Sequence, residues 1–309
     1  TFVKYNTPSL LPLLGIPFLW GPLGGAEHAP AVFYREFGWR TRAVEAVRRL
    51  LQIVAPFSPL LRWTARNATL SIGVTKETVA ALKQLGAAKV LQVPAVALSD
   101  AEVTTLSQEV SMSNQSPRLL YVGRLIAWKG VHLALRALAE STAKALTLTI
   151  IGDGSLRSWL EIESKKLGLA DRVHFLGDRP RNEVLEACRS SDGFLYPSLH
   201  DSGGNAVIEA MAAGLPVIHL AYGGPDFLVP NNAGWKVHAE TPTEALNGLT
   251  LALNAFADDE KERQQRGENA KQHVLTHHTW RARGSMLRML YDYLTQAESH
   301  PASDALPKI

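Results

Sequence analysis

The chain has 309 residues, which is enough for two domains of the usual ~100–200 residues each. Its composition, 46% hydrophobic and 20% charged, is that of an ordinary folded protein, and no apolar run approaches the ~20 residues that a membrane-spanning helix needs. A net charge of +3 with no nucleic-acid-binding motif argues against a nucleic acid partner, and one cysteine, Cys188, excludes an internal disulfide.

The first part of the chain, residues 1–96, predicts a partial α/β domain. Short β-rich runs at residues 16–20, 69–74 and 89–94 predict three strands. A long basic helical stretch lies between the first two of them. Residues 97–117 are polar and predict an interdomain linker that contains a short helix.

A glycine-rich turn is expected directly after the first of these strands. Its adjacent glycines, Gly24 and Gly25, would let a phosphate or sugar approach the backbone closely. Glu27 and His28 follow at once, and we expect them on the acceptor side, with His28 as a candidate general base. A tight turn without a ligand is the alternative.

The basic stretch extends from Arg35 to Arg66 and holds seven arginines against two glutamates. It also carries large apolar and aromatic side chains, among them Trp39 and Phe57. This combination favours docking on an anionic membrane surface. The alternative is an amphipathic helix that packs on its own sheet and leaves its arginines in solvent, and both interpretations stay open.

Strand-like and helix-like segments alternate regularly from residue 118 onward, which predicts βαβ units and a parallel, doubly wound sheet. The expected strands cover residues 118–122, 145–151, 172–176, 193–196, 215–220 and 235–237, and the expected helices residues 131–140, 155–167, 182–189 and 206–213. We expect a C-terminal domain over residues 118–278 with further helices from residue 241. A last helix over 279–297 should cross back to the N-terminal domain, and 298–309 should form a tail.

Two carboxylates, Asp201 and Glu209, stand eight residues apart around a glycine loop and the start of a helix. Helix N-termini present free N–H groups and a partial positive charge that attract phosphate. Glu209 lies among apolar residues, where a free surface carboxylate is rare, and it can accept hydrogen bonds from sugar hydroxyls. The alternative is a helix capped by Asp201 or Ser202 with a structural Glu209.

Two cations, Arg124 and Lys129, follow a predicted strand and its terminal Gly123. A leaving nucleoside diphosphate gains negative charge, which two fixed cations can neutralise. Two more loops after strands, at Gly152 and Gly177, are either ligand-facing or ordinary turns. No metal-ligand set stands out, so the sequence predicts neither a metal nor another cofactor.

Together these motifs resemble glycosyltransferase family 4, the retaining nucleotide-sugar transferases of GT-B architecture, also called glycosyl transferases group 1. The motifs that carry the resemblance lie at residues 123–130, 151–154, 175–177 and 201–217, with a weaker pattern at residues 17–25. The resemblance implies an α/β fold with two Rossmann-like doubly wound domains, of which the N-terminal one is incomplete.

The resemblance also implies roles for individual residues. Arg124 and Lys129 would bind the donor diphosphate, Glu209 the ribose, and Asp201 the transferred sugar, while the loop at residues 177–180 would lie by the base. Asp201 stands where the family usually has glutamate, which is one methylene longer. The expected donor-binding set is Gly123, Arg124, Lys129, Gly152, Gly177, Arg179, Ser202, Gly203, Gly204, Asn205 and Glu209.

The implied function is transfer of a hexose from a nucleoside-diphosphate sugar to a glycan or lipid-linked acceptor, with retention of the anomeric configuration. The expected setting is polysaccharide biosynthesis in the cytoplasm, at the inner face of the cell membrane. The short first half and the absence of an initiator methionine predict a fragment. A non-catalytic nucleotide-sugar-binding module that needs a partner, or a phosphorylase of the same architecture, is the alternative.

Overall fold

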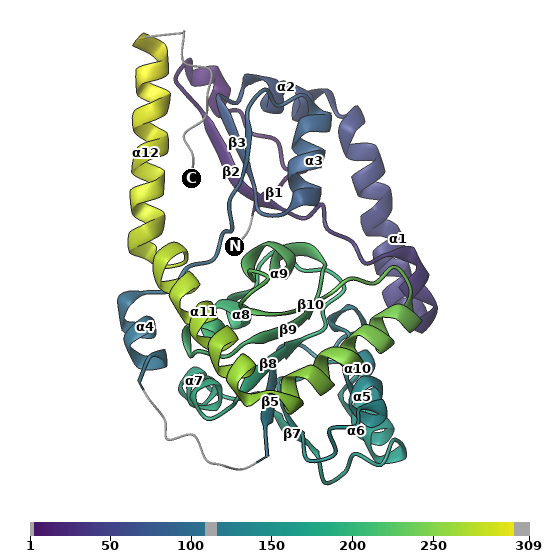
Figure 1. The fold of residues 1–309 in the computed structure, drawn as a ribbon. Coiled ribbons are helices and arrows are strands. Elements are labelled where there is room, and N and C mark those ends of the chain that lie inside the picture. The colour runs from purple at the N-terminus through teal and green to yellow at the C-terminus, as the bar shows by residue number, and fades with distance from the viewer. Residues whose placement is uncertain (1–2, 109–115, 300–309) are drawn as a thin grey trace.

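The computed structural model describes residues 3–108 and 116–299, and Figure 1 shows that these residues form two α/β layers stacked one above the other. Within them, one sheet has four strands in the order β1-β2-β3-β4, and the other has six in the order β10-β9-β8-β5-β6-β7. The strands are β1 (Val3–Lys4), β2 (Leu19–Gly24), β3 (Leu70–Gly73), β4 (Val90–Gln92), β5 (Arg118–Val122), β6 (Thr147–Ile151), β7 (Val173–Gly177), β8 (Gly193–Tyr196), β9 (Val217–Leu220) and β10 (Gly234–Val237).

The helices connect and cover these strands. The α-helices are α1 (Trp39–Val54), α2 (Pro59–Asn67), α3 (Lys76–Leu85), α4 (Asp100–Leu106), α5 (Val131–Glu140), α6 (Arg157–Lys166), α7 (Arg181–Arg189), α8 (Asn205–Ala212), α9 (Gly223–Leu228), α10 (Pro242–Asp258), α11 (Glu260–His277) and α12 (Trp280–Ser299). The described residues also form the short 3₁₀ helices η1 (Leu11–Leu14), η2 (Ala31–Glu36), η3 (Ala55–Phe57) and η4 (Ala127–Lys129). No helix that the structure describes is long and apolar enough to cross a bilayer.

The C-terminal sheet confirms the predicted doubly wound α/β fold. All of its strand pairs are parallel, and the chain reverses its direction of travel across the sheet between β5 and β8. Every strand and helix predicted between residues 118 and 240 is present, with bounds within two residues of the observed ones, whereas α9 was not predicted. Ligands of such sheets bind where the strand order reverses, at the carboxyl ends of the strands.

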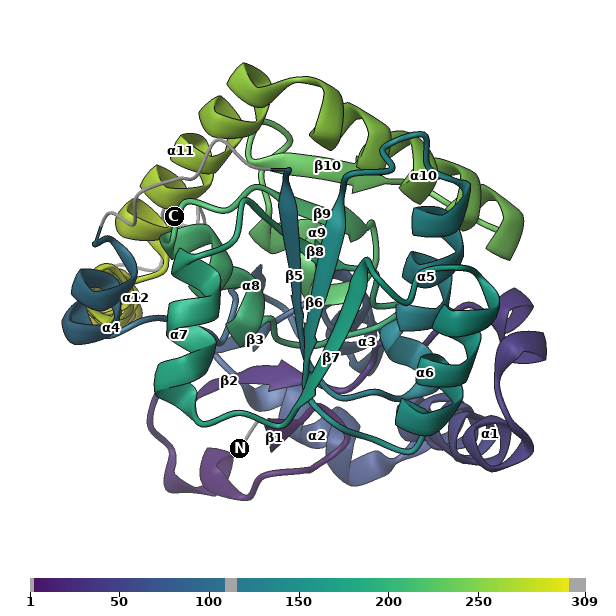
Figure 2. The same ribbon diagram turned by 90° about the horizontal axis from the view of Figure 1, so that it is seen from below.

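Helices cover both faces of this sheet, as Figure 2 shows from below, and an apolar core lies on each face. One core joins the sheet to α5, α6 and α10, and the other joins it to α7, α8 and α11. Strands β8 and β9 are buried along their whole length, which explains their continuous apolar sequence. The cysteine, Cys188, lies buried in the second core, where burial raises the pKa of its thiol to about 12.

His219 of β9 gives the first testable prediction. It is fully buried, and burial lowers the pKa of its imidazole to about 4. In the unfolded chain the His219 imidazole has its ordinary pKa of about 6.5 and binds a proton below that pH, whereas in the folded chain it stays neutral down to about pH 4. The free energy of unfolding therefore falls by up to about 3 kcal/mol as the pH drops to about 4. Replacing His219 by leucine should remove this part of the acid sensitivity in thermal unfolding, whereas His174→Leu, at an exposed position, should not; equal slopes in the two variants would contradict it.

Strand β2 differs from the prediction. The sequence predicted a strand over residues 16–20 followed by a turn, but β2 begins at Leu19 and continues through Gly24. Its register against β3 shifts between Trp20 and Leu23, and a side chain at Gly21 would meet the Ile72 carbonyl oxygen at 2.6 Å. The glycines therefore let the strand pack closely on its neighbour and do not form an open turn.

The basic stretch also differs, because it forms two helices and not one. Helix α1 ends at Val54, η3 follows with Pro56 inside it, and Pro59 begins α2. Proline disfavours helix in the residue before it, and Ser58, which precedes Pro59, is extended (φ −72°, ψ 117°), so the chain breaks there. The Ser58 hydroxyl then caps α2 by accepting from the amide of Leu61 at 3.4 Å.

Helix α12 packs on the N-terminal sheet and leaves α2 and α3 to cover the opposite face (Figure 1). It ends at Ser299, two residues beyond the predicted helix, and residues 300–309 of the predicted tail lie outside the described residues. The residues of α12 that face the sheet are Met286, Leu290 and Leu294, and they contact Leu70, Ile72 and Val93.

The segment predicted as a linker, residues 97–117, is partly built into the C-terminal domain. Its helix α4 begins with a capping box between Ser99 and Glu102, and Leu98 and Leu106 belong to the core beneath α7 and α8. Residues 109–115 lie outside the described residues. The described part of the segment is thus anchored and not a free tether.

Candidate active site

Lys129, Tyr196 and Asp201 form a closed triangle at the carboxyl end of β8. The ammonium of Lys129 donates to the Tyr196 hydroxyl oxygen at 2.7 Å and also donates to Asp201 Oδ2. The Tyr196 hydroxyl donates to the same carboxylate oxygen. Two residues predicted from the motifs are therefore brought together, and the sequence analysis missed the tyrosine because it ends an apolar strand.

A glycine allows this approach. Gly130 follows Lys129 with φ at 70°, and a Cβ there would lie 2.0 Å from the Pro197 carbonyl oxygen. The amide of Leu199 donates to the Trp128 carbonyl at 2.8 Å. Consequently η4 lies directly against the end of β8, which carries Lys129 to Asp201.

Electrostatics fix the charge states in this triangle. Burial alone would raise the pKa of Asp201, but the Lys129 charge and the hydrogen bonds from Lys129 and Tyr196 outweigh it and hold the pKa below its usual value. Burial and the neighbouring carboxylate raise the pKa of Tyr196 well above its usual value. Asp201 is therefore ionised at neutral pH, and Tyr196 is a neutral donor.

Glu209 occupies a second, buried position on α8. Its carboxylate accepts from Arg181 Nη1 at 3.0 Å, and Arg181 also donates to Glu102. Burial raises the pKa of Glu209, although the Arg181 charge opposes this. Both residues open onto an interdomain cavity of about 540 Å³. The other residues around it are Gly21, Pro22, Ala95, Val96, Ala97, Leu98, Glu102, Asn205 and Trp280.

A second arginine near this loop was not predicted. Arg179, which the sequence predicted by the ligand, is exposed and pairs with Glu183 at 3.5 Å, and its contact with a ligand stays a prediction. Arg181, two residues further on, begins α7 and reaches Glu209. Its only sequence signal is its place directly after Pro180, where a helix commonly starts.

The loop between the two carboxylates ends in a bare helix N-terminus. Helix α8 begins at Asn205, which is exposed, and among the described residues no side chain caps it. The nearby Ser202 hydroxyl donates instead to Glu27 Oε2 at 2.7 Å. The first N–H groups of α8 thus keep their capacity to bind an anion, beside a loop that contains Gly203 and Gly204.

The remaining glycines of the predicted set shape the strand ends. The amide of Gly123 donates to the Ile151 carbonyl at 3.0 Å, and that of Gly152 donates to the Gly177 carbonyl at 2.8 Å. A side chain at Gly152 would meet the Gly123 carbonyl oxygen at 2.1 Å, so the glycine lets two loops pack together. Arg124 follows with an exposed side chain that pairs with none of the described residues.

The prediction that Glu27 contacts an acceptor does not fit the structure. Its side chain is 3% exposed. One carboxylate oxygen accepts from Thr75 at 2.8 Å and Thr78 at 2.9 Å, and the other accepts from the Gly25 amide at 2.9 Å and from Ser202. Glu27 therefore joins the N-terminal domain to the loop after Asp201 and has no lone pair to spare.

His28 lies at the edge of another cavity, of about 530 Å³, in the N-terminal domain. Arg49 Nη1 donates to His28 Nε2 at 2.5 Å. Burial and the Arg49 charge lower the pKa of His28, so the imidazole is neutral at neutral pH. Gly24 ends strand β2, four residues before His28 in the chain. A side chain at Gly24 would come within 3.1 Å of Ser202, so the end of β2 lies against the loop after Asp201.

Helix α1 also reaches the donor-side loops. Arg48 Nη1 donates to His200 Nε2 at 2.7 Å and to Glu45 Oε1 at 2.8 Å. The His200 ring stacks on Trp128, with 5.4 Å between the ring centroids. Since Trp128 precedes Lys129 and His200 precedes Asp201, α1 holds the two segments that carry this pair.

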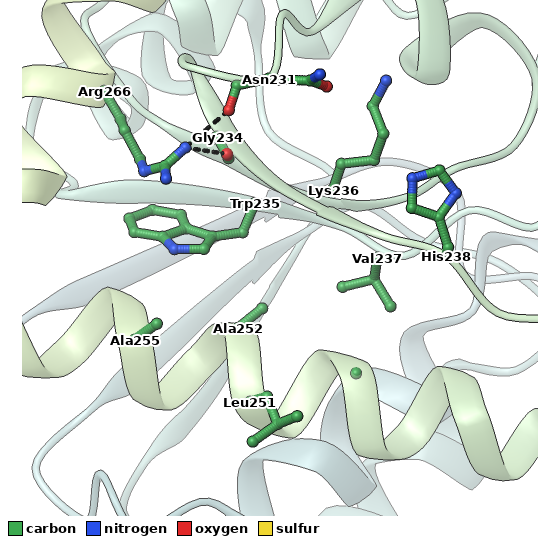
Figure 3. Close-up of a pocket in the computed structure, with 11 residues that line it drawn as sticks. Asn231, Gly234, Trp235, Lys236, Val237, His238, Leu251, Ala252, Ala255 and Arg266 are labelled. Atoms are coloured by element: carbon green, nitrogen blue, oxygen red, sulfur yellow. Dashed lines mark hydrogen bonds between the residues drawn. The ribbon is translucent and has the colours of Figure 1, made fainter.

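A cavity of about 610 Å³ lies apart from these residues, between β10 and α10 (Figure 3). Arg266 closes one end by donating to the Asn231 and Gly234 carbonyls at 2.8 and 2.7 Å, and its guanidinium stacks 4.9 Å from the Trp235 ring. None of the residues in the expected donor-binding set lines this cavity. We therefore place the candidate active site at the interdomain cleft and not here.

No group of three histidine, cysteine, aspartate or glutamate side chains in the described part of the chain could hold a metal ion. Positive groups at the site include the Lys129 ammonium, the exposed Arg124 guanidinium, the Arg181 guanidinium and the N-terminus of α8. These groups suit an anionic ligand such as a diphosphate.

Two Rossmann-like domains that face each other across such a cleft define the GT-B architecture. The sequence model of the family "Glycosyl transferases group 1" matches residues 103–273, more than half of the chain. The protein therefore belongs to this family, which confirms the family and the fold expected from the motifs.

Known relatives agree with this assignment. A glycogen synthase from Mycobacterium tuberculosis is 30% identical over 185 residues, which are 59% of this chain and 44% of the relative. The chain thus spans less than half the length of that relative. Two solved structures at 22% identity share the fold: sucrose-phosphate synthase from Thermosynechococcus elongatus (TM-score 0.65, 87% of this chain and 67% of the other) and Anabaena HepE with UDP and glucose (TM-score 0.57, 89% and 71%).

Proposed function

We propose that the protein transfers a hexose from a nucleoside-diphosphate sugar to a glycan or lipid-linked acceptor with retention of configuration. The observation that carries this proposal is the arrangement around α8. Lys129 and the uncapped helix N-terminus offer positive charge at one end, and the buried Glu209 carboxylate opens onto the interdomain cavity further along the helix. This arrangement suits a diphosphate joined to a ribose.

Individual roles follow from position and charge. Lys129 and Arg124 bind the diphosphate, and Glu209 accepts hydrogen bonds from the ribose hydroxyls. Asp201 contacts the transferred sugar, where its negative charge stabilises an oxocarbenium-like transition state. Tyr196 is a positioning residue, because it holds the Asp201 carboxylate.

The proposed reaction proceeds on one face of the sugar. The acceptor oxygen forms a bond to the anomeric carbon while the bond from that carbon to the phosphate oxygen breaks, and the nucleoside diphosphate leaves with the electron pair. The acceptor proton passes to the departing phosphate. Lys129, Arg124 and the α8 N-terminus neutralise the charge that develops, and the proposal includes no metal.

The relatives support a nucleotide-sugar donor, since HepE was solved with UDP and glucose. They leave the acceptor open, because glycogen synthase and sucrose-phosphate synthase are named for different products. A role in polysaccharide biosynthesis in the cytoplasm, at the inner face of the cell membrane, completes the proposal. The alternative, a non-catalytic nucleotide-sugar-binding module that needs a partner, is one outcome of the experiment below.

Calorimetric titration with UDP, GDP, ADP and UDP-glucose, paired with donor hydrolysis, tests the proposal. We expect one nucleotide to bind, and Glu209→Gln to weaken it roughly tenfold to hundredfold because charge-assisted hydrogen bonds to ribose are lost. Since burial raises the pKa of Glu209, affinity should fall on acidification sooner than an ordinary glutamate would allow.

Glu186→Gln, at an exposed position on α7, is the matched control and should leave affinity unchanged. Binding without any turnover would favour the non-catalytic module. Failure of all four compounds to bind would contradict the donor site itself.

A further inference from the structure

Helix α1 exposes its apolar face to solvent and turns polar side chains inward, which is the reverse of an ordinary surface helix. Along its sixteen residues, all of which the structure describes, Glu45 is the one that is buried. Leu50 is 59% exposed although it lies in the middle of the apolar stripe. A helix on a globular protein normally buries its apolar stripe and exposes its charges. We define the outer face of α1 and η3 as Trp39, Val47, Leu50, Leu51, Ile53, Val54 and Phe57, all of them exposed.

Polar contacts fix this orientation. Besides the bonds of Glu45 and Arg48 described above, the Gln52 side-chain amide donates to the Gly25 and Glu27 carbonyls at 3.2 Å. A rotation that buried the apolar side chains would break these contacts. Figure 1 shows α1 at the edge of the molecule, on the side away from α12, where nothing in the described structure covers its outer face.

The charge of this region is one-sided. The two glutamates between Arg35 and Arg66 are both paired inward: Glu36 accepts from His132 and Arg136 at 3.0 Å, and Glu45 accepts from Arg48. Several of the arginines, by contrast, are exposed. They are Arg35, Arg40, Arg42, Arg49, Arg62 and Arg66. The surface around α1 and α2 therefore combines apolar side chains with positive charge that the two inward-paired glutamates do not neutralise.

Exposed apolar side chains are also present next to α1. Phe57 of η3 is 76% exposed and Leu60 of α2 is exposed as well. Ser9 and Thr64 exchange hydrogen bonds of 3.2 and 3.0 Å, which attach the segment before η1 to α2. Exposed apolar side chains gathered on one helix face mark an interaction site, and the basic surroundings select an anionic partner.

The cavity that contains His28 opens at the rim of this surface. Ile53 and Phe57 line it and also belong to the outer face of α1 and η3. The polar wall of this cavity includes Arg49 and Glu77. The Oε2 atom of Glu77 is buried and has no hydrogen-bond partner among the described residues. A molecule whose apolar part lies on the outer face can therefore place a polar head beside His28.

We propose that the outer face of α1 and η3 docks on the anionic surface of a lipid bilayer, and that the acceptor is an amphiphile of that bilayer whose polar head enters the His28 cavity. The docking step is supported by the exposed apolar and basic side chains alone. The assignment of the amphiphile as acceptor rests on the proposed function. Glu27, next to His28, bonds Ser202 of the loop after Asp201, which connects the cavity wall to the donor side.

Vesicle flotation tests the docking step. The chain should float with vesicles of phosphatidylglycerol and phosphatidylcholine, and less with pure phosphatidylcholine. Leu50→Gln with Val54→Gln should lower binding at least roughly tenfold, because apolar area is lost. Arg40→Gln and Arg62→Gln should each lower it roughly fivefold.

Matched controls lie on the other domain: Leu251→Gln on α10 and Lys165→Gln on α6 change exposed residues and should leave flotation unchanged. Failure to float with anionic vesicles, or equal flotation of Leu50→Gln with Val54→Gln, would overturn the proposal. A dimer in sedimentation that the same double variant dissociates would also overturn it, since a second copy would then cover the face.

Binding of octyl glucoside below its micelle concentration, compared with methyl glucoside, tests the acceptor class. The octyl compound should bind more tightly, and Phe57→Ser should remove the difference without changing nucleotide affinity. Equal affinities, or no binding of the octyl compound, would overturn a lipid-borne acceptor. Nucleotide binding is measured separately, so failure here is distinguishable from failure of the donor site.

Discussion

Replacing Lys129 by methionine is expected to lower the rate of glycosyl transfer by roughly a hundred- to a thousandfold. Its ammonium is held at the end of β8 by Tyr196 and Asp201, which fixes it before any donor arrives. A preorganised charge stabilises the leaving diphosphate without reorganisation during the reaction. Initial rates with the nucleotide sugar identified by titration measure the effect.

Methionine keeps the length and apolar stem of lysine and removes only the charge. Lys165→Met, on the exposed face of α6, is the matched control and should keep full activity. Because Asp201 loses its cation, circular dichroism must establish that Lys129→Met folds. A folded variant with the rate of the unchanged protein would contradict the role given to Lys129.

The C-terminal domain could be predicted well because its local signals agree. Strands β5, β6, β7 and β8 are short runs that end at a glycine or proline, and helices such as α5 and α7 have a clear apolar stripe. Two elements differ from the prediction, one in each domain. Strand β2 of the N-terminal domain contains Gly21 and Pro22, which usually signal a turn, but packing against Ile72 keeps this segment in the sheet. Helix α9 begins with two glycines and therefore carries no helical signal.

The site could be predicted only as far as its motifs extend. The sequence suggested Lys129, Asp201 and Glu209, and the structure brings the first two into contact. It could not suggest Tyr196 or Arg181, because an apolar strand and a charged helix start have ordinary structural explanations. These partners become visible only when strands distant in the sequence lie side by side.

The two domains are coupled by contacts that no single-sequence pattern reveals. Glu27 looked like a ligand-facing acid beside a glycine turn, yet its partners come from α3 and from the loop after Asp201. His200, in the loop before Asp201, binds α1 through Arg48, and no sequence signal indicated this contact. The N-terminal domain therefore contacts the donor loop both before Asp201, at His200, and after it, at Ser202. These contacts contribute to the geometry of the donor site.

Because of this coupling, helix α1 connects the donor loop to the proposed membrane surface. The inward face of the helix holds His200, next to Asp201, and its outer face is the proposed membrane surface. A ligand can shift an equilibrium only by as much as it prefers one state. Docking would therefore act on the donor loop only if the Arg48 contact differs between the free and the bound protein.

Replacing Asp201 by asparagine should separate donor binding from transfer. In the absence of a donor, Lys129 is paired with Asp201, so an incoming diphosphate must compete with this carboxylate for the ammonium. Asparagine has the same shape, can still accept from Tyr196, and removes the competing negative charge. We expect affinity for the nucleoside diphosphate to rise roughly tenfold, which corresponds to about 1.4 kcal/mol, while transfer falls at least roughly a hundredfold.

The opposite signs of these two effects make the test decisive. A merely structural Asp201 would lower both quantities, and a residue outside the site would change neither. Asp171→Asn lies before the start of β7, at the far end of the sheet from the loops, and is the matched control. Because the pKa of Asp201 is held below its usual value, its carboxylate is charged at neutral pH in the unchanged protein, so the Asp201→Asn variant should show the gain in affinity at neutral pH. A fall in nucleoside diphosphate affinity would mean that Asp201 orients Lys129 for the phosphate and does not compete for it.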